Sequence, residues 1–192
     1  MTTEKRHLCA VALVVTIAIA HPAAQGHTDL KRVRTESSFL QAVVSTAFDR
    51  SVLFQSLIDR IERSDVIAHL TCAQFSSETL AGRTVLVAAK AEVRYLRVEV
   101  RCQQLMPPLV GIVAHELQHD VEIASAPSVI DDQSIAALFR TIGFQSRGAF
   151  WGGQFETTAA QDVGDRVQSE VFRRPAPILI DASVERPARA RN

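Results

Sequence analysis

The spacing of hydrophobic residues divides the chain into a helical part, a strand-rich part and a second helical part. Between Ser38 and Ile61 the apolar residues recur three or four positions apart, which predicts one long helix or two shorter ones. The pattern then changes to short runs rich in β-branched residues, at 66–72, 84–89 and 92–102. The last run alternates apolar and charged residues, as expected for a strand with one buried face. We therefore expect three strands.

The connections indicate how these strands are arranged. Only Lys90 and Ala91 separate the second run from the third, so these two strands are expected to form an antiparallel hairpin. Residues 27–37, ahead of the first helix, show no sustained pattern and are expected to form a polar lead-in. The sheet should therefore be small and three-stranded, with mixed or antiparallel pairing.

Proline and glycine mark the boundaries of the next two helices. Pro107 and Pro108 end the strand-rich part and start a helix expected over 109–124, because proline is tolerated in the first helical turn and not in the interior. A further helix is expected over 131–142, with an aspartate near its start and Gly143 just past its end.

The remainder of the chain is less regular. Residues 143–154 form a glycine-rich aromatic segment that predicts a loop, and a last helix is expected from about Phe155 to Phe172. Residues 175–192 are rich in proline and arginine and are expected to form a loose tail. The element order predicts an α+β fold in one domain over 27–174, with the sheet and its preceding helix packed on the 109–124 helix.

The N-terminus has the composition of an export signal. Lys5 and Arg6 precede an uncharged run from Leu8 to Ala20, and small residues follow up to Gly26. The run is shorter than the roughly 20 residues that a membrane-spanning helix needs. We therefore expect residues 1–26 to be a signal peptide, and the mature protein to be secreted or periplasmic in a bacterium, without a stable membrane span.

Composition narrows the function classes. The chain has 21 Lys and Arg against 21 Asp and Glu and no formal net charge. Such a balance provides no positive field to attract phosphates, and no local basic patch stands out, so a nucleic-acid partner is not expected. The 47% of hydrophobic residues is in the range of ordinary globular domains.

Export to a compartment where disulfides persist changes how the cysteines are interpreted. Of the three cysteines, Cys9 lies within the expected signal peptide, which leaves Cys72 and Cys102 as an even pair. We expect these two to form a disulfide, with two buried free thiols as the alternative. A disulfide requires Cα atoms within about 7 Å, which favours the first strand beside the third.

The clearest chemical signal is the string His-Glu-Leu-Gln-His, which contains His115, Glu116 and His119 on the helix expected over 109–124. Histidines four positions apart project from one helix face, so their imidazoles can hold one Zn²⁺ ion. Glu116 is offset around the helix, where its carboxylate can act as general base on a zinc-bound water. The alternative is that the histidines are ordinary polar residues on a solvated face.

Because this motif follows a helix and three strands in the sequence, the chain resembles the zincin metalloproteases over residues 38–172. It is also similar to a group of uncharacterised bacterial secreted proteins that carry the HELQH helix and a later FET-A-A segment. The resemblance implies a minimal zincin-like fold, a bound Zn²⁺ ion, hydrolysis of peptide bonds, and a peptide or protein as substrate.

The resemblance also guides the choice of the third zinc ligand, since a catalytic zinc ion usually has three protein ligands. The third histidine of the metzincin subgroup is absent, because Ser125 occupies its position. Gluzincins instead use a glutamate from a later helix, and Glu156 fits this arrangement. Its alternative role is a carboxylate at a helix N-terminus, which the helix dipole favours. Glu122 shares the histidine face, but three turns of one straight helix do not easily converge on one ion.

Four residues are candidates for supporting roles. Asp120 could orient a zinc histidine through its second ring nitrogen, and Glu122 could be an outer partner or a charge at the rim. Gluzincins commonly have a downstream tyrosine or histidine that stabilises the oxyanion, and neither follows His119. Tyr95 and Arg147 are the candidate substitutes. The absence of a tyrosine or histidine after His119 supports a second interpretation, in which the protein is a non-catalytic extracytoplasmic zinc-binding or interaction domain.

Overall fold

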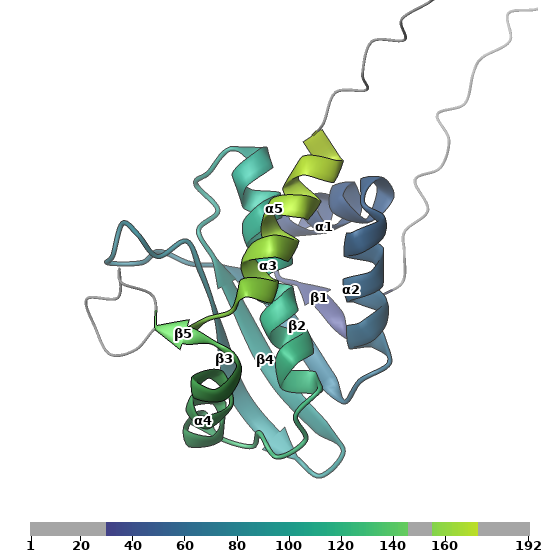
Figure 1. The fold of residues 1–192 in the computed structure, drawn as a ribbon. Coiled ribbons are helices and arrows are strands. Elements are labelled where there is room, and N and C mark those ends of the chain that lie inside the picture. Colours follow the sequence, from purple (N-terminus) through teal and green to yellow (C-terminus); the bar gives the residue numbers. More distant parts are fainter. Residues whose placement is uncertain (1–29, 146–154, 173–192) are drawn as a thin grey trace, which may run out of the picture.

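The computed structural model describes residues 30–145 and 155–172, and Figure 1 shows helices gathered over one face of a small sheet. Along the chain the elements are β1 (Val33–Thr35), α1 (Ser38–Arg50), α2 (Val52–Glu62), β2 (Val66–Cys72), β3 (Gly82–Lys90), β4 (Val93–Val100), α3 (Met106–Ala124), α4 (Asp132–Ile142), β5 (Phe144–Gln145), β6 (Phe155–Glu156) and α5 (Thr158–Phe172). The mixture of helices with a small mixed sheet confirms the expected α+β class.

The main sheet has the strand order β1-β2-β4-β3. Strands β3 and β4 form the expected antiparallel hairpin, closed by the pair Lys90 and Val93. Strand β2 lies parallel to β4, with Cys72 opposite Val100. The first and third of the expected strands are therefore neighbours, and β3 is left at one edge of the sheet.

Within the described residues the main sheet contains four strands, so the expectation of three was wrong. Residues 33–35 were expected to belong to a polar lead-in, but they pair in parallel with β2. Three residues are too few to display an alternating pattern in the sequence. Distant contacts hold this strand, since the Glu62 carboxylate accepts hydrogen bonds from the backbone N–H groups of Arg32 at 2.8 Å and Val33 at 3.1 Å.

The first helical segment is two helices, because the chain breaks at Ser51. This residue has extended backbone angles, and its hydroxyl accepts a hydrogen bond from Phe54 N at 3.0 Å, which caps the start of α2. The same hydroxyl donates to Glu170 Oε2 at 2.6 Å, on α5. The corner between α1 and α2 is thereby fixed against the last helix.

The sheet buries one face only. Alternate residues of β2 and β4, such as Leu70, Leu96 and Val98, are fully buried beneath the helices, whereas His69 and Tyr95 between them lie exposed on the other face. The core cluster joins these residues to side chains from every large helix, including Leu40, Phe54, Leu117 and Val167.

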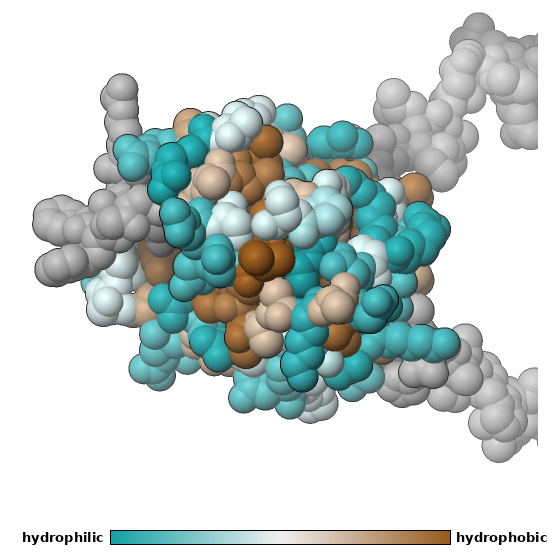
Figure 2. Space-filling view, turned by 90° about the horizontal axis from the view of Figure 1, so that it is seen from below, coloured by the Kyte–Doolittle hydropathy of each residue, from teal (hydrophilic) through white to brown (hydrophobic). Residues whose placement is uncertain are grey.

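Figure 2 shows another side of the molecule, where a central group of hydrophobic residues is surrounded by hydrophilic ones.

Helix α3 starts as expected with prolines in its first turn, and its C-terminal end is held by a buried arginine. The Arg94 side chain is 3% exposed and forms two hydrogen bonds of 2.7 Å with the Asp65 carboxylate. Its guanidinium also donates to the carbonyls of Ile123 and Ala126, each at 2.8 Å. Carbonyls at a helix end lack intrahelical donors, so Arg94 caps α3 from the sheet.

The segment after α3 differs from the expectation at one important point. Helix α4 begins at the expected cap, Asp131, which forms a capping box with Ser134. Gly143 follows α4, and the short strands β5 and β6 then pair. Because α5 begins at Thr158, Glu156 lies on a strand and not in the last helix as expected.

The expected disulfide is confirmed. Cys72, at the end of β2, is bonded to Cys102, two residues after β4, and their Cα atoms are 5.4 Å apart. The expected signal peptide, the loose tail and Arg147 lie outside the described residues. Within residues 30–145 and 155–172, no helix combines the length and apolar character that crossing a membrane requires.

Candidate metal centre

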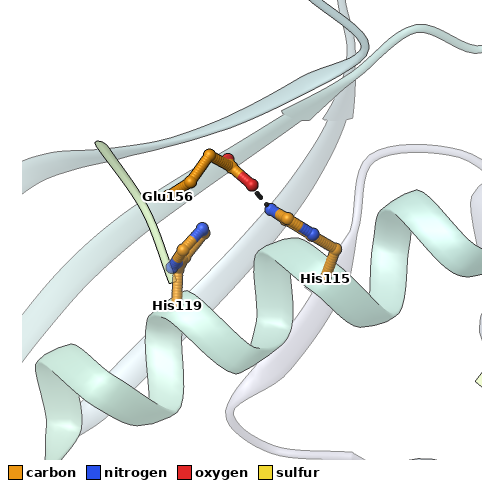
Figure 3. A group of neighbouring side chains, drawn as sticks. All are labelled: His115, His119 and Glu156. Atoms are coloured by element: carbon orange, nitrogen blue, oxygen red, sulfur yellow. Dashed lines mark hydrogen bonds and ion pairs between the residues drawn. The ribbon is translucent and has the colours of Figure 1, made fainter. Parts of the chain in front are cut away.

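The three residues expected to bind the metal ion, His115, His119 and Glu156, lie close together. His115 and His119 project from α3 toward Glu156, which comes from the neighbouring β6 (Figure 3). One candidate ligand atom from each residue lies within 4.8 Å of the others. His115 Nε2 lies 3.3 Å from Glu156 Oε1. As expected from helix geometry, the two histidines four positions apart project from the same face of α3.

Glu156 reaches the histidines through the hairpin of β5 and β6, where it pairs with Phe144. The hairpin approaches the end of α4 so closely that a Cβ atom at Gly143 would lie 2.5 Å from the Glu156 carbonyl oxygen. Only a residue without a side chain leaves room for this approach. Gly143 was expected only as a helix stop, and its second role depends on a contact that the sequence does not reveal.

The orientation of His119 is set by Glu122. His119 Nδ1 lies 2.8 Å from Glu122 Oε2, which leaves Nε2 as the nitrogen available to a metal ion. Burial raises the pKa of Glu122, but hydrogen bonds from His119 and Thr157 outweigh this effect and lower the pKa below its ordinary value. On its other side, the His119 ring meets Phe139 edge to face, with centroids 5.1 Å apart.

The contact between His115 and Glu156 favours a proton on the histidine and a charge on the carboxylate. Burial lowers the pKa of His115, but the hydrogen bond to Glu156 and the charge of Glu116 raise it to a greater extent. Burial raises the pKa of Glu156, and the His115 contact reverses the shift, so the pKa is lowered. A metal ion would replace this proton as the positive partner of Glu156.

Glu116 lies beside this group in a very different environment. It is 5% exposed, and its Oε2 lies 3.3 Å from the Thr84 hydroxyl on β3. Burial raises its pKa, the nearby His119 and His115 lower it by a smaller amount, and the pKa remains above its ordinary value. A raised pKa makes a carboxylate a stronger proton acceptor, as a general base near neutral pH requires.

Asp120 does not occupy the expected position against a histidine. Its side chain is fully buried toward β3, and Oδ1 accepts a hydrogen bond from the Thr84 hydroxyl at 3.1 Å. Among the described residues, Asp120 Oδ2 has no hydrogen-bond partner. Burial raises the pKa of this carboxyl well above its ordinary value. Glu122 makes the histidine contact that was expected of Asp120. On a helix, a residue three positions after His119 lies on the same face as the histidine, whereas the residue directly after it does not.

Of the two candidates for oxyanion stabilisation, Tyr95 lies away from the site. Tyr95 is 37% exposed on the sheet face that points away from α3, because alternate residues of β4 face opposite sides. It therefore lies behind the sheet and does not line the cleft described below. Arg147 falls outside the described residues. In the part of the chain that the structure describes, Arg83 is the arginine that lines the cleft, and its Nε donates a hydrogen bond to Glu99 Oε2.

A cleft of about 750 Å³ surrounds the three candidate ligands. One wall is the start of the edge strand β3 with the loop before it, and the others come from α3, α4, β6 and α5. The lining includes Thr79, Leu80, Ala81, Gly82, Arg83, Thr84, Pro108, Gly111, Ile112, Ile135, Phe139, Phe155, Gln161, Gly164, Asp165 and Gln168. Sequence reasoning missed Thr84 and Gly82, although a glycine at a strand position signals a close approach of another group.

The donor set fits a divalent transition metal. Two imidazole nitrogens and one carboxylate oxygen are ligands of the kind that zinc accepts, and tetrahedral bonds of about 2.0–2.2 Å would place them roughly 3.3–3.6 Å apart. The 3.3 Å between His115 Nε2 and Glu156 Oε1 lies in this range, and all three donor atoms lie within 4.8 Å of one another. Compared with protein-family models, curated proteins and solved structures, the chain matched none of them.

Proposed function

We propose that this protein is a zinc-dependent metallopeptidase of the zincin type with a gluzincin-like ligand set. The observation that supports this most strongly is that Glu156 lies within reach of His115 and His119 although it is distant from them in sequence. The buried Glu116 beside these three residues provides a carboxylate in the position of a general base. The sequence resemblance to zincins, which is carried by the same motif, agrees with this proposal.

His115, His119 and Glu156 would hold the ion, and Glu122 would keep the His119 ring in place through Nδ1. A bound zinc ion supplies a Lewis acid, which polarises a scissile carbonyl and makes a water molecule more acidic. The remaining steps belong to Glu116. Its carboxylate accepts a proton from the water that adds to the carbonyl carbon, and later transfers the proton to the nitrogen of the leaving amine. One water is consumed for each peptide bond broken.

Peptide or protein is the substrate class that the cleft suits best. Among the described strands, β3 pairs with β4 on one side only, so its other edge offers backbone N–H and C=O groups to an added strand. Gly82, Arg83 and Thr84 of this strand also line the cleft beside Glu116. An extended peptide added to this edge would pass in front of the candidate metal ligands.

Export from the cytoplasm is part of the proposal. The disulfide between Cys72 and Cys102 is compatible with an oxidising compartment. The sequence of residues 1–26 independently has the features of a signal peptide. A secreted or periplasmic location in a bacterium is therefore the location we propose.

A second candidate is a non-catalytic zinc-binding or interaction domain. The specific observation in its favour is that no tyrosine or histidine follows His119 in the sequence. A peptidase at this site would have to stabilise the oxyanion with the metal ion and with other donors. The two candidates agree on metal binding and differ only in the expected turnover.

The decisive comparison uses the exported form of the chain and two glutamate variants. Zinc content is measured by mass spectrometry, and hydrolysis is followed with labelled casein and a quenched peptide library. Glu116→Gln should keep the zinc and lose at least about a hundredfold in activity. The matched control is Glu92→Gln in the exposed β3–β4 turn, which should retain both properties.

The outcomes separate the candidates. If wild type and Glu116→Gln hydrolyse the probes equally, the catalytic assignment is wrong. If wild type binds one zinc ion and hydrolyses nothing in the library, the second candidate is favoured. If wild type takes up no zinc when the metal is supplied at micromolar concentration, both candidates fail.

A further inference from the structure

We propose that strand β3 positions the general base, with Gly82 and Thr84 forming a cradle that holds the Glu116 carboxylate. The inference rests on the proposed function, because it assigns positioning roles relative to Glu116. The hydroxyl of Thr84 contacts Glu116 and Asp120, and neither of these is a candidate metal ligand.

Thr84 contacts one oxygen of the base. Its hydroxyl lies 3.3 Å from Glu116 Oε2 and 3.1 Å from Asp120 Oδ1. Glu116 and Asp120 are one helical turn apart on α3, so the hydroxyl bridges two neighbouring carboxylates of that helix. Asp120 is fully buried, and its carboxyl is a second hydrogen-bond partner of the hydroxyl. The threonine is therefore held in a defined position against the base.

Gly82 borders the other oxygen. A Cβ atom at this position would lie 2.6 Å from Glu116 Oε1 and 2.9 Å from Glu116 Cγ. The Glu116 side chain thus occupies space that any larger residue at position 82 would need. Because Gly82 and Thr84 are two positions apart on one strand, both face α3. One oxygen of Glu116 contacts a hydroxyl, and the other lies against the bare backbone.

This arrangement joins the base to the strand that borders the cleft. The register of β3 against β4 places Gly82 opposite Val100 and Thr84 opposite Val98, so the cradle is built into the sheet. A positioned carboxylate transfers protons efficiently only when its orientation is maintained. The structural alternative is that Thr84 serves only to satisfy the buried Asp120 carboxyl.

The test compares Thr84→Val, which removes the hydroxyl at nearly constant volume, with Thr84→Ser, which keeps it. Thr71→Val on β2 is the matched control, since Thr71 alternates with the buried residues of that strand. For each variant we would measure zinc content, and kcat and KM on a quenched peptide that wild type cleaves. Crystal structures of the zinc-free variants would give the position of the Glu116 carboxylate.

The proposal expects Thr84→Val to bind zinc normally and to lose about tenfold in kcat with little change in KM. Its Glu116 carboxylate should move away from β3. Thr84→Ser should restore most of kcat, and Thr71→Val should match wild type. A Thr84→Val protein with normal kcat and an unmoved carboxylate would overturn the proposal and leave Thr84 as a partner of Asp120 alone.

Gly82→Ala is an independent variant that decides the matter if Thr84→Val does not fold. Its methyl group should displace the carboxylate and lower kcat without removing zinc, and an unmoved carboxylate would again overturn the proposal. Failure of the proposed function is distinguishable, because it shows as zinc-loaded wild type without hydrolysis. The crystal structures still decide the cradle in that case.

Discussion

The hydroxyl of Thr157 donates a hydrogen bond to Glu122 Oε1 across 2.7 Å. The other oxygen of Glu122 contacts His119 Nδ1 at 2.8 Å. One carboxylate therefore links the residue next to Glu156 to the helix that carries both histidines. These contacts hold the candidate ligands from two separate parts of the chain in register.

The first prediction concerns this link. Glu122→Ala should weaken zinc binding by about 10- to 100-fold, because a metal-binding histidine loses the partner that fixes its ring. The measurement is competition for zinc with a chromophoric chelator. Glu92→Ala in the exposed β3–β4 turn serves as control and should leave the affinity unchanged. An unaltered affinity in Glu122→Ala would show that the ring needs no such support.

The second prediction concerns how Glu156 is held. Gly143→Ala should reduce zinc affinity, because its methyl group would meet the Glu156 carbonyl oxygen and displace the hairpin. Glu156→Ala should reduce the affinity directly by removing a ligand. In the double variant, the Gly143→Ala change should have little additional effect, since the Glu156 carboxylate, whose position the displaced hairpin would alter, is already absent. Full additivity would contradict an action of Gly143 through Glu156.

A third prediction compares two arginines. Arg94→Met should lower the free energy of unfolding by about 3 kcal/mol, because it breaks the ion pair of the buried Arg94 with Asp65 and removes the hydrogen bonds to the carbonyls of Ile123, Ala124 and Ala126 at the end of α3. Arg63→Met removes an exposed ion pair with Asp59, where the arginine side chain is 71% exposed, and should cost under about 1 kcal/mol. Urea unfolding of both variants provides the comparison. Equal losses would mean that Arg94 does not anchor the end of α3.

The fourth prediction is a dependence of stability on acid. The hydrogen bonds from Arg94 lower the pKa of Asp65 from its ordinary value of 3.8, and the partial burial of the carboxyl opposes this shift. The folded pKa is thus below the unfolded one, so the stabilisation is fully present above the unfolded value. It is lost as the pH falls through the folded value.

Urea unfolding between about pH 2 and pH 6 would measure this dependence. Asp65→Asn should be less stable than wild type at pH 6, and the difference should shrink at the acid end of the series. Asp59→Asn, in the exposed ion pair with Arg63, is the matched control. A difference that stays constant over the whole range would contradict a contribution from the Asp65 charge.

Local patterns in the sequence determined most of the architecture. The three- and four-residue spacing before Ile61, the alternation in 92–102 and the prolines at 107 and 108 each depend on neighbouring positions, and all three appear as expected elements. The pairing of His115 with His119 is local in the same sense, because one helical turn separates them. The pairing of Cys72 with Cys102 could be expected because few cysteines were available.

Features that depend on contacts between distant segments were decided by the tertiary structure. Strand β1 exists because β2 and Glu62 bind its backbone, and Glu156 meets the histidines from a strand because Gly143 permits a close approach. Tertiary contacts also decided that Glu122 and not Asp120 orients His119, and that Tyr95 lies on the far face of the sheet. The position of Gly82 and Thr84 against Glu116 was decided in the same way. A residue's type and spacing limit what it can do, but its partners across the fold are set by packing, which no local pattern records.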